Sequence, residues 1–339
     1  MKKEKLIFSI ILVVYDPWDN FSHPDALPKA IKSLDLLEGD FELIIVINDD
    51  IENCPKTTSF LRDLRDEKPN IKLLELSKNL GCSGGFNRGV NLSDEDTEVI
   101  IYLSCDAFIV DPLVLTKISE VFQKYPIIAA LHPVSIYEDS NEINFSKAYS
   151  RKKFQNQVEI MDYEASEELP DNSLDEILGI SNSVKNRKCK PVYPLHSLPL
   201  TFYAVRRKVY ELLGGFDEEF IAGYENIDFA LRALQKGHKS AILNNSFIFH
   251  RRLLFRFLGQ AGINQALLNT AVKNGKPIWK KKWRQEPMDA YYQILYGKFW
   301  GQYFGSHLNR INNFMKSILP WGKHCLSIFD IIDGKDQNK

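Results

Sequence analysis

Acidic residues and one histidine stand at positions where they could do chemistry. Asp106 lies just past the end of the apolar run Val99–Leu103, and His250 ends the apolar run FIFH. A carboxylate at the end of a strand is where an α/β enzyme would hold a divalent cation, and a histidine followed by Arg251 and Arg252 could help to neutralise phosphates. Glu225 and Asp228 are three residues apart at the start of a predicted helix, so both lie on one helical face. Each residue also has a structural interpretation, as a helix cap, a dipole partner or a core histidine.

A glycine-rich segment, Asn79–Gly89 (NLGCSGGFNRG), follows an apolar run. Glycine permits close backbone approach and positive φ angles, and a helix that starts here would direct amide groups at an anion. The spacing fits neither GxxxxGK[ST] nor GxGxxG, which disfavours a P-loop and a dinucleotide fingerprint. A purely structural turn remains an alternative.

Strand-like and helix-like patterns alternate over the first hundred residues, which predicts a parallel sheet covered on both faces. We expect strands at 6–14, 41–47, 71–76 and 98–103, and helices at 24–37, 57–66 and 82–91. Later we expect a strand leading into a helix at 203–213, a helix at 227–235 and a strand at 241–249. Ligands of such sheets bind at the carboxyl ends of the strands, where polar residues appear here.

The ordered set of segments resembles the inverting glycosyltransferases of family 2, which have the GT-A fold. The segments are SIILVVYD, IIVINDD, NLGCSGGFNRG, LSCDA, LLGGFDEEFIAGYENIDFALRALQKGH and FIFH. The resemblance covers about residues 6–252 and is greatest to rhamnosyltransferase-like members that build bacterial surface polysaccharides. It implies a Rossmann-like, mostly parallel α/β sheet flanked by helices, with a mainly helical C-terminal appendage.

The resemblance also implies an activity. A metal-dependent hexosyl- or deoxyhexosyltransferase would move a sugar from a UDP- or dTDP-sugar donor to a glycan or lipid-linked acceptor. Asp106 and His250 would hold Mn²⁺ or Mg²⁺, Glu225 or Asp228 would be the base, and Arg232 would be structural or face phosphate. The residues implied to bind the nucleotide sugar are Tyr15, Asn48, Asp49, Asn79, Gly85, Asn87, Ser104 and Asp106.

Three positions depart from the family pattern. Ser104 replaces the first aspartate of the DxD motif, and Asn48 replaces the usual base-contacting aspartate, which leaves the nucleotide open. Asn226 replaces the usual general base, and an amide cannot usefully accept a proton. Glu225 is therefore the expected base, with Asp228 as the alternative.

Asn226 also keeps a second hypothesis open, a catalytically impaired nucleotide-sugar-binding or assembly subunit. A nucleotidyltransferase is a third hypothesis. It lacks support, because no glycine-rich loop with Lys or Arg directly follows the first predicted strand.

We expect a catalytic domain over residues 1–252 and a basic, aromatic-rich, helical region over 253–339. The catalytic domain would comprise a nucleotide-sugar half (1–107) and an acceptor half (108–252) with a polar insertion at 138–192. Residues 251–325 hold thirteen Lys or Arg but two acidic residues, although the whole chain has a net charge of -1. This basic region predicts either contact with an anionic membrane or an appendage that packs its aromatic residues on the catalytic domain. No nucleic-acid-binding motif accompanies the charge.

Composition narrows the class of protein. The hydrophobic content of 44% excludes a disordered or fibrous chain. The five cysteines are scattered with no CxxC pair, which favours reduced thiols over disulfides or zinc. The apolar run at 6–14 is too short to span a bilayer. We expect a cytoplasmic protein, peripheral on the inner face of the cell membrane, and leave homo-oligomerisation open.

Overall fold

The computed structural model describes a sheet, its flanking helices and one helix from the C-terminal region. The described residues are 6–17, 19, 21, 26–139, 142–143, 192–195, 198, 200–221, 223–250, 275–284, 290 and 294. Most of the predicted insertion at 138–192 and of the predicted region 253–339 lies outside them.

The first half of the fold is a set of parallel βα units. The strands are β1 (Phe8–Val14), β2 (Phe41–Ile47), β3 (Ile71–Glu75) and β4 (Val99–Ser104), in the spatial order β3-β2-β1-β4. The connecting helices are α1 (Ala26–Ser33), the 3-10 turn η2 (Leu34–Leu36), α2 (Pro55–Glu67) and α3 (Gly81–Val90). Every residue of β1 is buried because β2 and β4 flank it on both sides and helices cover both faces.

The second half continues the same sheet with strands of both directions. Its elements are β5 (Ala107–Ile109), α4 (Val114–Lys124), β6 (Ile128–Asp139), β7 (Glu142–Ile143), β8 (Val192–Leu195), β9 (Phe202–Arg206), α9 (Arg207–Leu212), α10 (Glu225–Gln235) and β10 (Lys239–His250). The order β3-β2-β1-β4-β9-β6-β10-β5 makes β9 antiparallel to both of its neighbours, while β10 is parallel to β6. Short β5 pairs antiparallel with β10, so Ala107 lies opposite His250.

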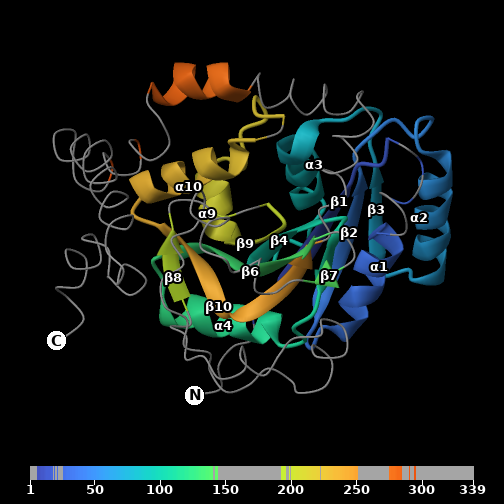
Figure 1. The fold of residues 1–339 in the computed structure, drawn as a ribbon, viewed down its shortest axis with the longest axis horizontal. Helices are drawn as coiled ribbons and strands as arrows, with labels where there is room; N and C mark the ends of the chain where they lie inside the picture. Colours follow the sequence, from blue (N-terminus) through green and yellow to red (C-terminus); the bar gives the residue numbers. More distant parts are fainter. Residues whose placement is uncertain are drawn as a thin grey trace.

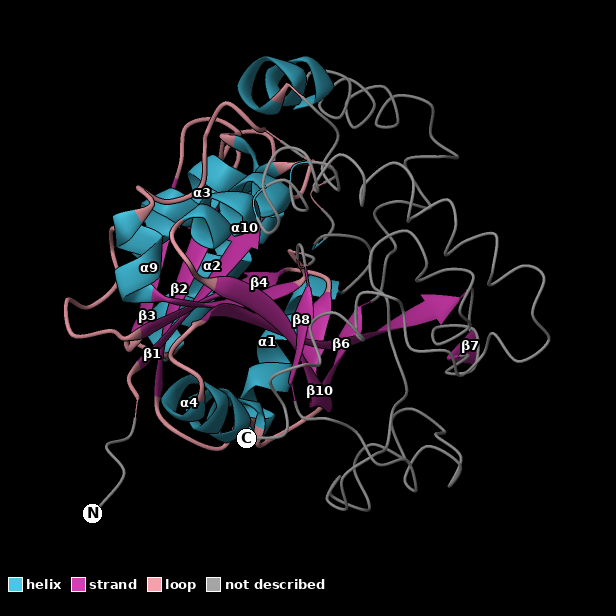
Figure 2. Cartoon of the chain, turned by 90° about the vertical axis from the view of Figure 1, so that its left-hand side faces the viewer, coloured by secondary structure: helices cyan, strands magenta, loops and turns pink. Residues whose placement is uncertain are grey.

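Helices pack on both faces of this sheet (Figures 1 and 2). One face carries α1, α2 and α4 over a large apolar cluster that includes Leu12, Leu61 and Ile118. The other face carries α3, α9 and α10 over a second cluster that includes Phe86 and Phe229. The helix at 275–283, orange in Figure 1, lies beyond α10 on this second side.

The α/β fold class predicted from sequence is confirmed, and the mostly parallel sheet is flanked by helices as expected. The predicted strand at 41–47 has the observed bounds, whereas α10 begins at Glu225 instead of residue 227. Strand β6 and its partner β7 also extend into the first residues of the predicted insertion. Among the described residues, no helix is long and apolar enough to cross a membrane.

Candidate active site

Asp106 and His250 meet where two antiparallel strands end. Asp106 lies in the turn between β4 and β5, and His250 is the last residue of β10, opposite Ala107. The Nε2 atom of His250 lies 3.2 Å from Oδ2 of Asp106, and both side chains are buried. Strand pairing therefore brings together two residues that are 144 positions apart in the sequence.

Neighbouring hydroxyl groups hold this pair. Ser104 donates a hydrogen bond to Oδ1 of Asp106, and Oγ1 of Thr201 lies 3.4 Å from Nδ1 of His250. Burial raises the pKa of Asp106, but His250 and the Ser104 hydrogen bond outweigh it and lower that pKa below its ordinary value. Asp106 is therefore an anion at neutral pH in a site shielded from water.

The donor set fits a divalent cation in part. A buried carboxylate and an imidazole whose second nitrogen meets a hydroxyl group are typical ligands for Mn²⁺ and similar ions. Within the part of the chain that the structure describes, no group of three or more His, Cys, Asp or Glu side chains could hold a metal. Oxygen atoms of a ligand or of water would have to complete the coordination of such an ion.

A second carboxylate, Glu225, begins α10 and is buried, and its Oε2 has no hydrogen-bond partner among the described residues. Burial raises the pKa of Glu225 from its ordinary value of 4.5 to about 7, although backbone amides of Glu225 and Gly223 act in the opposite direction. A carboxylate with a pKa near neutrality is suited to accept a proton from a hydroxyl group. Glu225 is therefore the best candidate for a general base among the described residues.

The thiol of Cys82 is affected by the charges of both Glu225 and Asp106. Burial raises the pKa of Cys82 to about 12, and the charges of Glu225 and Asp106 both act in the same direction, while a hydrogen bond with Tyr102 opposes them. Cys82 lies in the first turn of α3, where its amide donates to the carbonyl of Ile221 at 3.1 Å. Glu225 and Asp106 therefore both lie near enough to Cys82 to affect its thiol.

Asp228 and Asn226 differ from Glu225 because their side chains form hydrogen bonds with other residues of the protein. Asp228 accepts hydrogen bonds from Arg232 at 2.7 Å and from Trp283 at 2.9 Å. Asn226 donates through Nδ2 to the carbonyl of Leu198 at 2.7 Å. An ionised aspartate has no proton for that bond, so asparagine suits this position structurally. Neither side chain is arranged as a base in this structure.

The ends of β2 and β3 form a polar edge around Asn48. Its Nδ2 donates to the carbonyl of Gly81 at 3.0 Å, and its Oδ1 accepts from the amide of Leu80 at 3.0 Å. Oδ1 of Asn79 accepts from the amide of Gly81 at 2.7 Å. Asn48 and Asn79 therefore shape the glycine turn that begins α3.

Tyr15 and Asp49 lie at the same edge of the sheet. Burial and the charge of Asp49 raise the pKa of the Tyr15 phenol, although a hydrogen bond with Asn79 opposes them. Oδ1 of Asp49 accepts from the amide of Asp50 at 2.8 Å and from Asn53 at 3.2 Å. Three of the residues predicted to bind the nucleotide, Tyr15, Asp49 and Asn79, therefore lie together.

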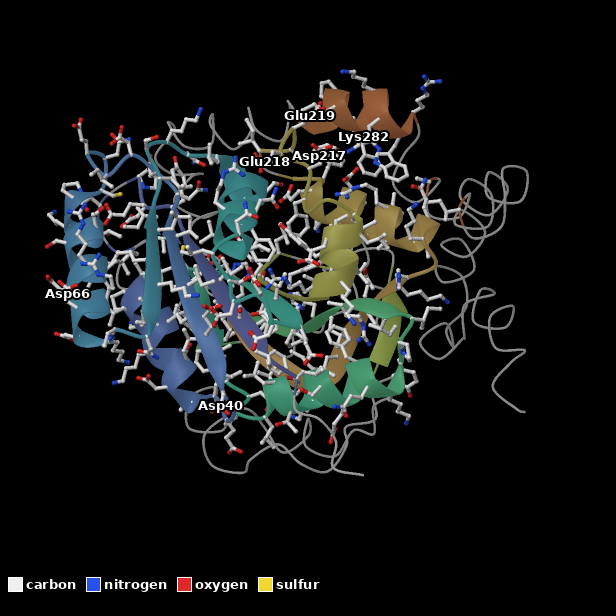
Figure 3. All side chains as sticks on the ribbon, turned by 180° about the vertical axis from the view of Figure 1, so that it is seen from behind. Asp40, Asp66, Asp217, Glu218, Glu219 and Lys282 are labelled. Carbon is white, nitrogen blue, oxygen red and sulfur yellow. The ribbon has the colours of Figure 1, made fainter. Side chains whose placement is uncertain are left out.

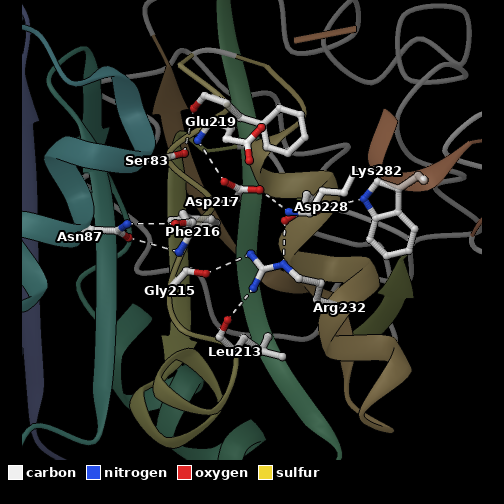
Figure 4. A network of polar contacts seen from close by, with 12 residues as sticks. Ser83, Asn87, Leu213, Gly215, Phe216, Asp217, Glu219, Asp228, Arg232 and Lys282 are labelled. Atoms are coloured by element: carbon white, nitrogen blue, oxygen red, sulfur yellow. Dashed lines mark hydrogen bonds and ion pairs between the residues drawn. The ribbon is translucent and has the colours of Figure 1, made fainter. Parts of the chain in front are cut away.

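Two other predicted contacts have structural surroundings. A Cβ atom added to Gly85 would lie 2.9 Å from Val13, so this position brings α3 close to the sheet. Asn87 donates to the carbonyl of Phe216 and to Glu218, each at 2.9 Å, and accepts a hydrogen bond from Tyr210. These bonds connect α3 to the segment before α10, as Figure 4 shows for Phe216.

The predicted site residues do not include Asp16, Cys82 or Tyr102. Asp16 is buried after β1, where Oδ2 accepts a hydrogen bond from Thr57 at 2.6 Å and Oδ1 has no hydrogen-bond partner among the described residues. Its place at the end of a buried strand could have marked it. The proximity of Cys82 to Glu225 could not be inferred, because a helix end and a distant loop meet there.

Residues 9–176 match the family model described as Glycosyl transferase family 2. No curated protein sequence matches the chain.

Two solved structures show the shared fold. A mannosyltransferase from Pyrobaculum calidifontis, in complex with GDP-Man and Mn²⁺, has a TM-score of 0.52 and 12% identity, and the alignment covers 96% of this chain and 78% of that one. GalNAc-T7, with UDP, GalNAc and Mn²⁺, has a TM-score of 0.55 and 13% identity, with coverage of 98% and 57% respectively. The chain therefore has the GT-A fold, and its residues 9–176 are similar to the glycosyl transferase family 2.

Proposed function

We propose that this chain is a metal-dependent, inverting glycosyltransferase. It would transfer a hexosyl or deoxyhexosyl group from a UDP- or dTDP-sugar to a glycan or lipid-linked saccharide of a bacterial surface polysaccharide pathway. The observation that carries the proposal is Glu225, whose Oε2 is buried with no hydrogen-bond partner in the part of the chain that the structure describes, and whose pKa is raised by burial to about 7. The charges of Glu225 and Asp106 both raise the pKa of Cys82, which supports a common site for the base and the donor diphosphate.

The reaction is a single displacement. Glu225 takes the proton from an acceptor hydroxyl group, and the hydroxyl oxygen attacks the anomeric carbon of the donor. The bond from that carbon to the diphosphate oxygen breaks on the opposite side, so the configuration inverts and the nucleoside diphosphate leaves. The carboxylate must be ionised to act, so the reaction rate should rise with pH through the pKa of Glu225.

Asp106 and His250 would hold the divalent ion. When bound, the ion supplies positive charge that stabilises the negative charge on the departing diphosphate. Ser104 and Thr201 orient this pair through the hydroxyl contacts described above. The two structural neighbours are complexes with Mn²⁺ and either GDP-Man or UDP, which supports this assignment without fixing the nucleotide.

The nucleotide would occupy the edge formed by Tyr15, Asp49 and Asn79, with Ser104 near the ribose. Asn48 and Gly85 would contribute by shaping this edge. We leave Asn87 out of the proposed contact set, because its side chain bonds to Phe216, Glu218 and Tyr210.

A binding-only subunit is the alternative that Asn226 suggested. The hydrogen bond from Asn226 to Leu198 weakens that argument, since Glu225 remains available as the base. A panel of UDP-, dTDP- and GDP-sugars with Mn²⁺ separates the two hypotheses. We expect release of a nucleoside diphosphate from at least one donor by the wild type, and about a hundredfold less from Asp106→Ala. Donor binding without release would favour the binding-only subunit.

A further inference from the structure

The helix at 275–283 contacts the turn that presents Glu225. We propose that this helix is a positioning element for the base, with Trp279 and Lys282 as its main contact residues. The inference rests on the proposed role of Glu225 and adds a part of the chain outside the residues that match the family model.

The turn before α10 needs support because its backbone is strained. Tyr224, the residue immediately before Glu225, has a φ of 75°, in the left-handed region that residues other than glycine rarely adopt. Such a conformation is unfavourable in free energy, and it persists only where contacts with surrounding residues stabilise it. A change of φ here would move the carboxylate of Glu225, because that residue comes next in the chain.

Trp279 supplies one such contact. Its ring is 1% exposed and stacks on the ring of Tyr224, with centroids 5.4 Å apart and planes at 29°. The ring of Trp283 also stacks on the ring of Trp279, with centroids 5.5 Å apart. Phe220 and Leu231 complete a separate apolar cluster that joins the 275–283 helix to α10 and the preceding loop. The strained tyrosine is therefore held between its own loop and the tryptophan of the distant helix.

Lys282 provides the polar half of this contact. Its Nζ forms ion pairs with Asp217 and, at 3.1 Å, with Asp228, so it bridges the two ends of the loop that contains Tyr224. Figure 3 shows Lys282 reaching from its helix toward Asp217. Trp283 donates through Nε1 to Asp228 at 2.9 Å. In Figure 4, Arg232 approaches Asp228 from within α10 and continues to the carbonyl groups of Leu213 and Gly215.

The loop is also fixed on its other side by α3. The Oγ atom of Ser83 donates to the carbonyl of Phe220 at 3.1 Å, and the amide of Cys82 donates to the carbonyl of Ile221. Gly81 allows this approach, since a Cβ atom there would lie 2.3 Å from the Ile221 oxygen. With α3 on one side and the 275–283 helix on the other, the loop has one arrangement that satisfies both.

The test compares full-length variants by hydrogen exchange and by nucleoside diphosphate release from the donor that the wild type turns over best. We expect Trp279→Ala to speed amide exchange in residues 217–228 by about tenfold or more, with β1, β2 and β4 unchanged. The same variant should lower kcat by about tenfold to a hundredfold with donor KM changed less than about threefold. Trp279→Phe should restore most of both properties. Lys281→Met, which removes an exposed charge from the same helix, should match the wild type.

Unchanged exchange in residues 217–228 and unchanged kcat in Trp279→Ala would overturn the proposal. If Trp279→Ala exposes the whole chain to exchange, Trp283→Phe and Lys282→Met decide instead, because each removes a bond to Asp228 and keeps the buried ring of Trp279. If these two variants show neither faster local exchange nor a lower kcat, the proposal is overturned as well. If Glu225→Gln keeps wild-type turnover, the proposed function of Glu225 fails, while the exchange data still show whether the helix holds the turn.

Discussion

At the scale of single residues, Glu225 and Asp228 show how two carboxylates on one helix face acquire different tasks. Both are buried, but Asp228 is hydrogen-bonded to Arg232 and Trp283, whereas no described residue forms a hydrogen bond with Oε2 of Glu225. The sequence identified the pair and favoured Glu225 only because it is next to the expected position of the base, at Asn226. The partner Trp283 lies 55 residues further along the chain, and only the folded protein brings it to Asp228.

The raised pKa of Glu225 makes a prediction about stability. The folded-state pKa of about 7 lies above the ordinary value of 4.5, so the stability that this group contributes is complete below about pH 4.5 and is lost as the pH rises through 7. Glu225→Gln has no carboxyl group to ionise. Its free energy of unfolding relative to the wild type should therefore increase between pH 5 and pH 8, by about 2–3 kcal/mol at most.

Urea unfolding of both proteins at the two pH values measures this difference. Glu219→Gln, which alters an exposed carboxylate of the preceding loop, is the matched control and should show no such increase. If the difference in free energy of unfolding between Glu225→Gln and the wild type stays constant with pH, burial does not raise the pKa of this carboxyl group.

At the scale of secondary structure, apolar runs made most of the first half of the fold predictable. The run FELIIVI has the bounds of β2, because a central parallel strand is buried on both faces and polar residues mark its end. The start of α10 was not predictable, since it depends on the positive φ of Tyr224. The antiparallel direction of β9 was not predictable either, because it follows from a pairing between distant segments.

The close packing of α3 on the sheet gives a prediction at this scale. A Cβ atom at Gly89 would lie 2.4 Å from Cγ2 of Ile11 and 3.1 Å from Cγ2 of Val46. Gly89→Ala should therefore push α3 from the sheet and lower the free energy of unfolding by about 1–3 kcal/mol. In an open helix the same change would stabilise by about 1 kcal/mol. A gain in urea midpoint would show that α3 does not approach β1 and β2 so closely.

At the scale of the whole molecule, the near-zero net charge conceals a division of the chain. Residues 251–325 are strongly basic, and the remainder is acidic. The predicted packing of C-terminal aromatic residues on the catalytic domain applies to Trp279 and Trp283, which contact Tyr224 and Asp228. Those two rings are therefore engaged within the protein, and any membrane contact by the described helix must use its exposed lysines.

Lys276, Lys280 and Lys281 are exposed on the 275–283 helix, which leads to a prediction about membranes. We expect the protein to float with phosphatidylglycerol-containing vesicles at about 0.15 M salt, and not with phosphatidylcholine vesicles. Replacement of the three lysines by glutamine should weaken flotation, because each exposed charge adds attraction. No flotation of the wild type with anionic vesicles would exclude a peripheral membrane contact through this region.

The pH dependence of donor turnover tests the central claim most directly, namely that Glu225 is the base of a sugar transfer. The rate of nucleoside diphosphate release with Mn²⁺ should be measured for the wild type and for Glu225→Gln, with Asp228→Asn beside them. We expect the wild-type rate to rise to a plateau above about pH 7, and the Glu225→Gln rate to be at least about a hundredfold lower and flat with pH. A Glu225→Gln variant with the wild-type rate and pH profile, together with an inactive Asp228→Asn, would contradict the claim.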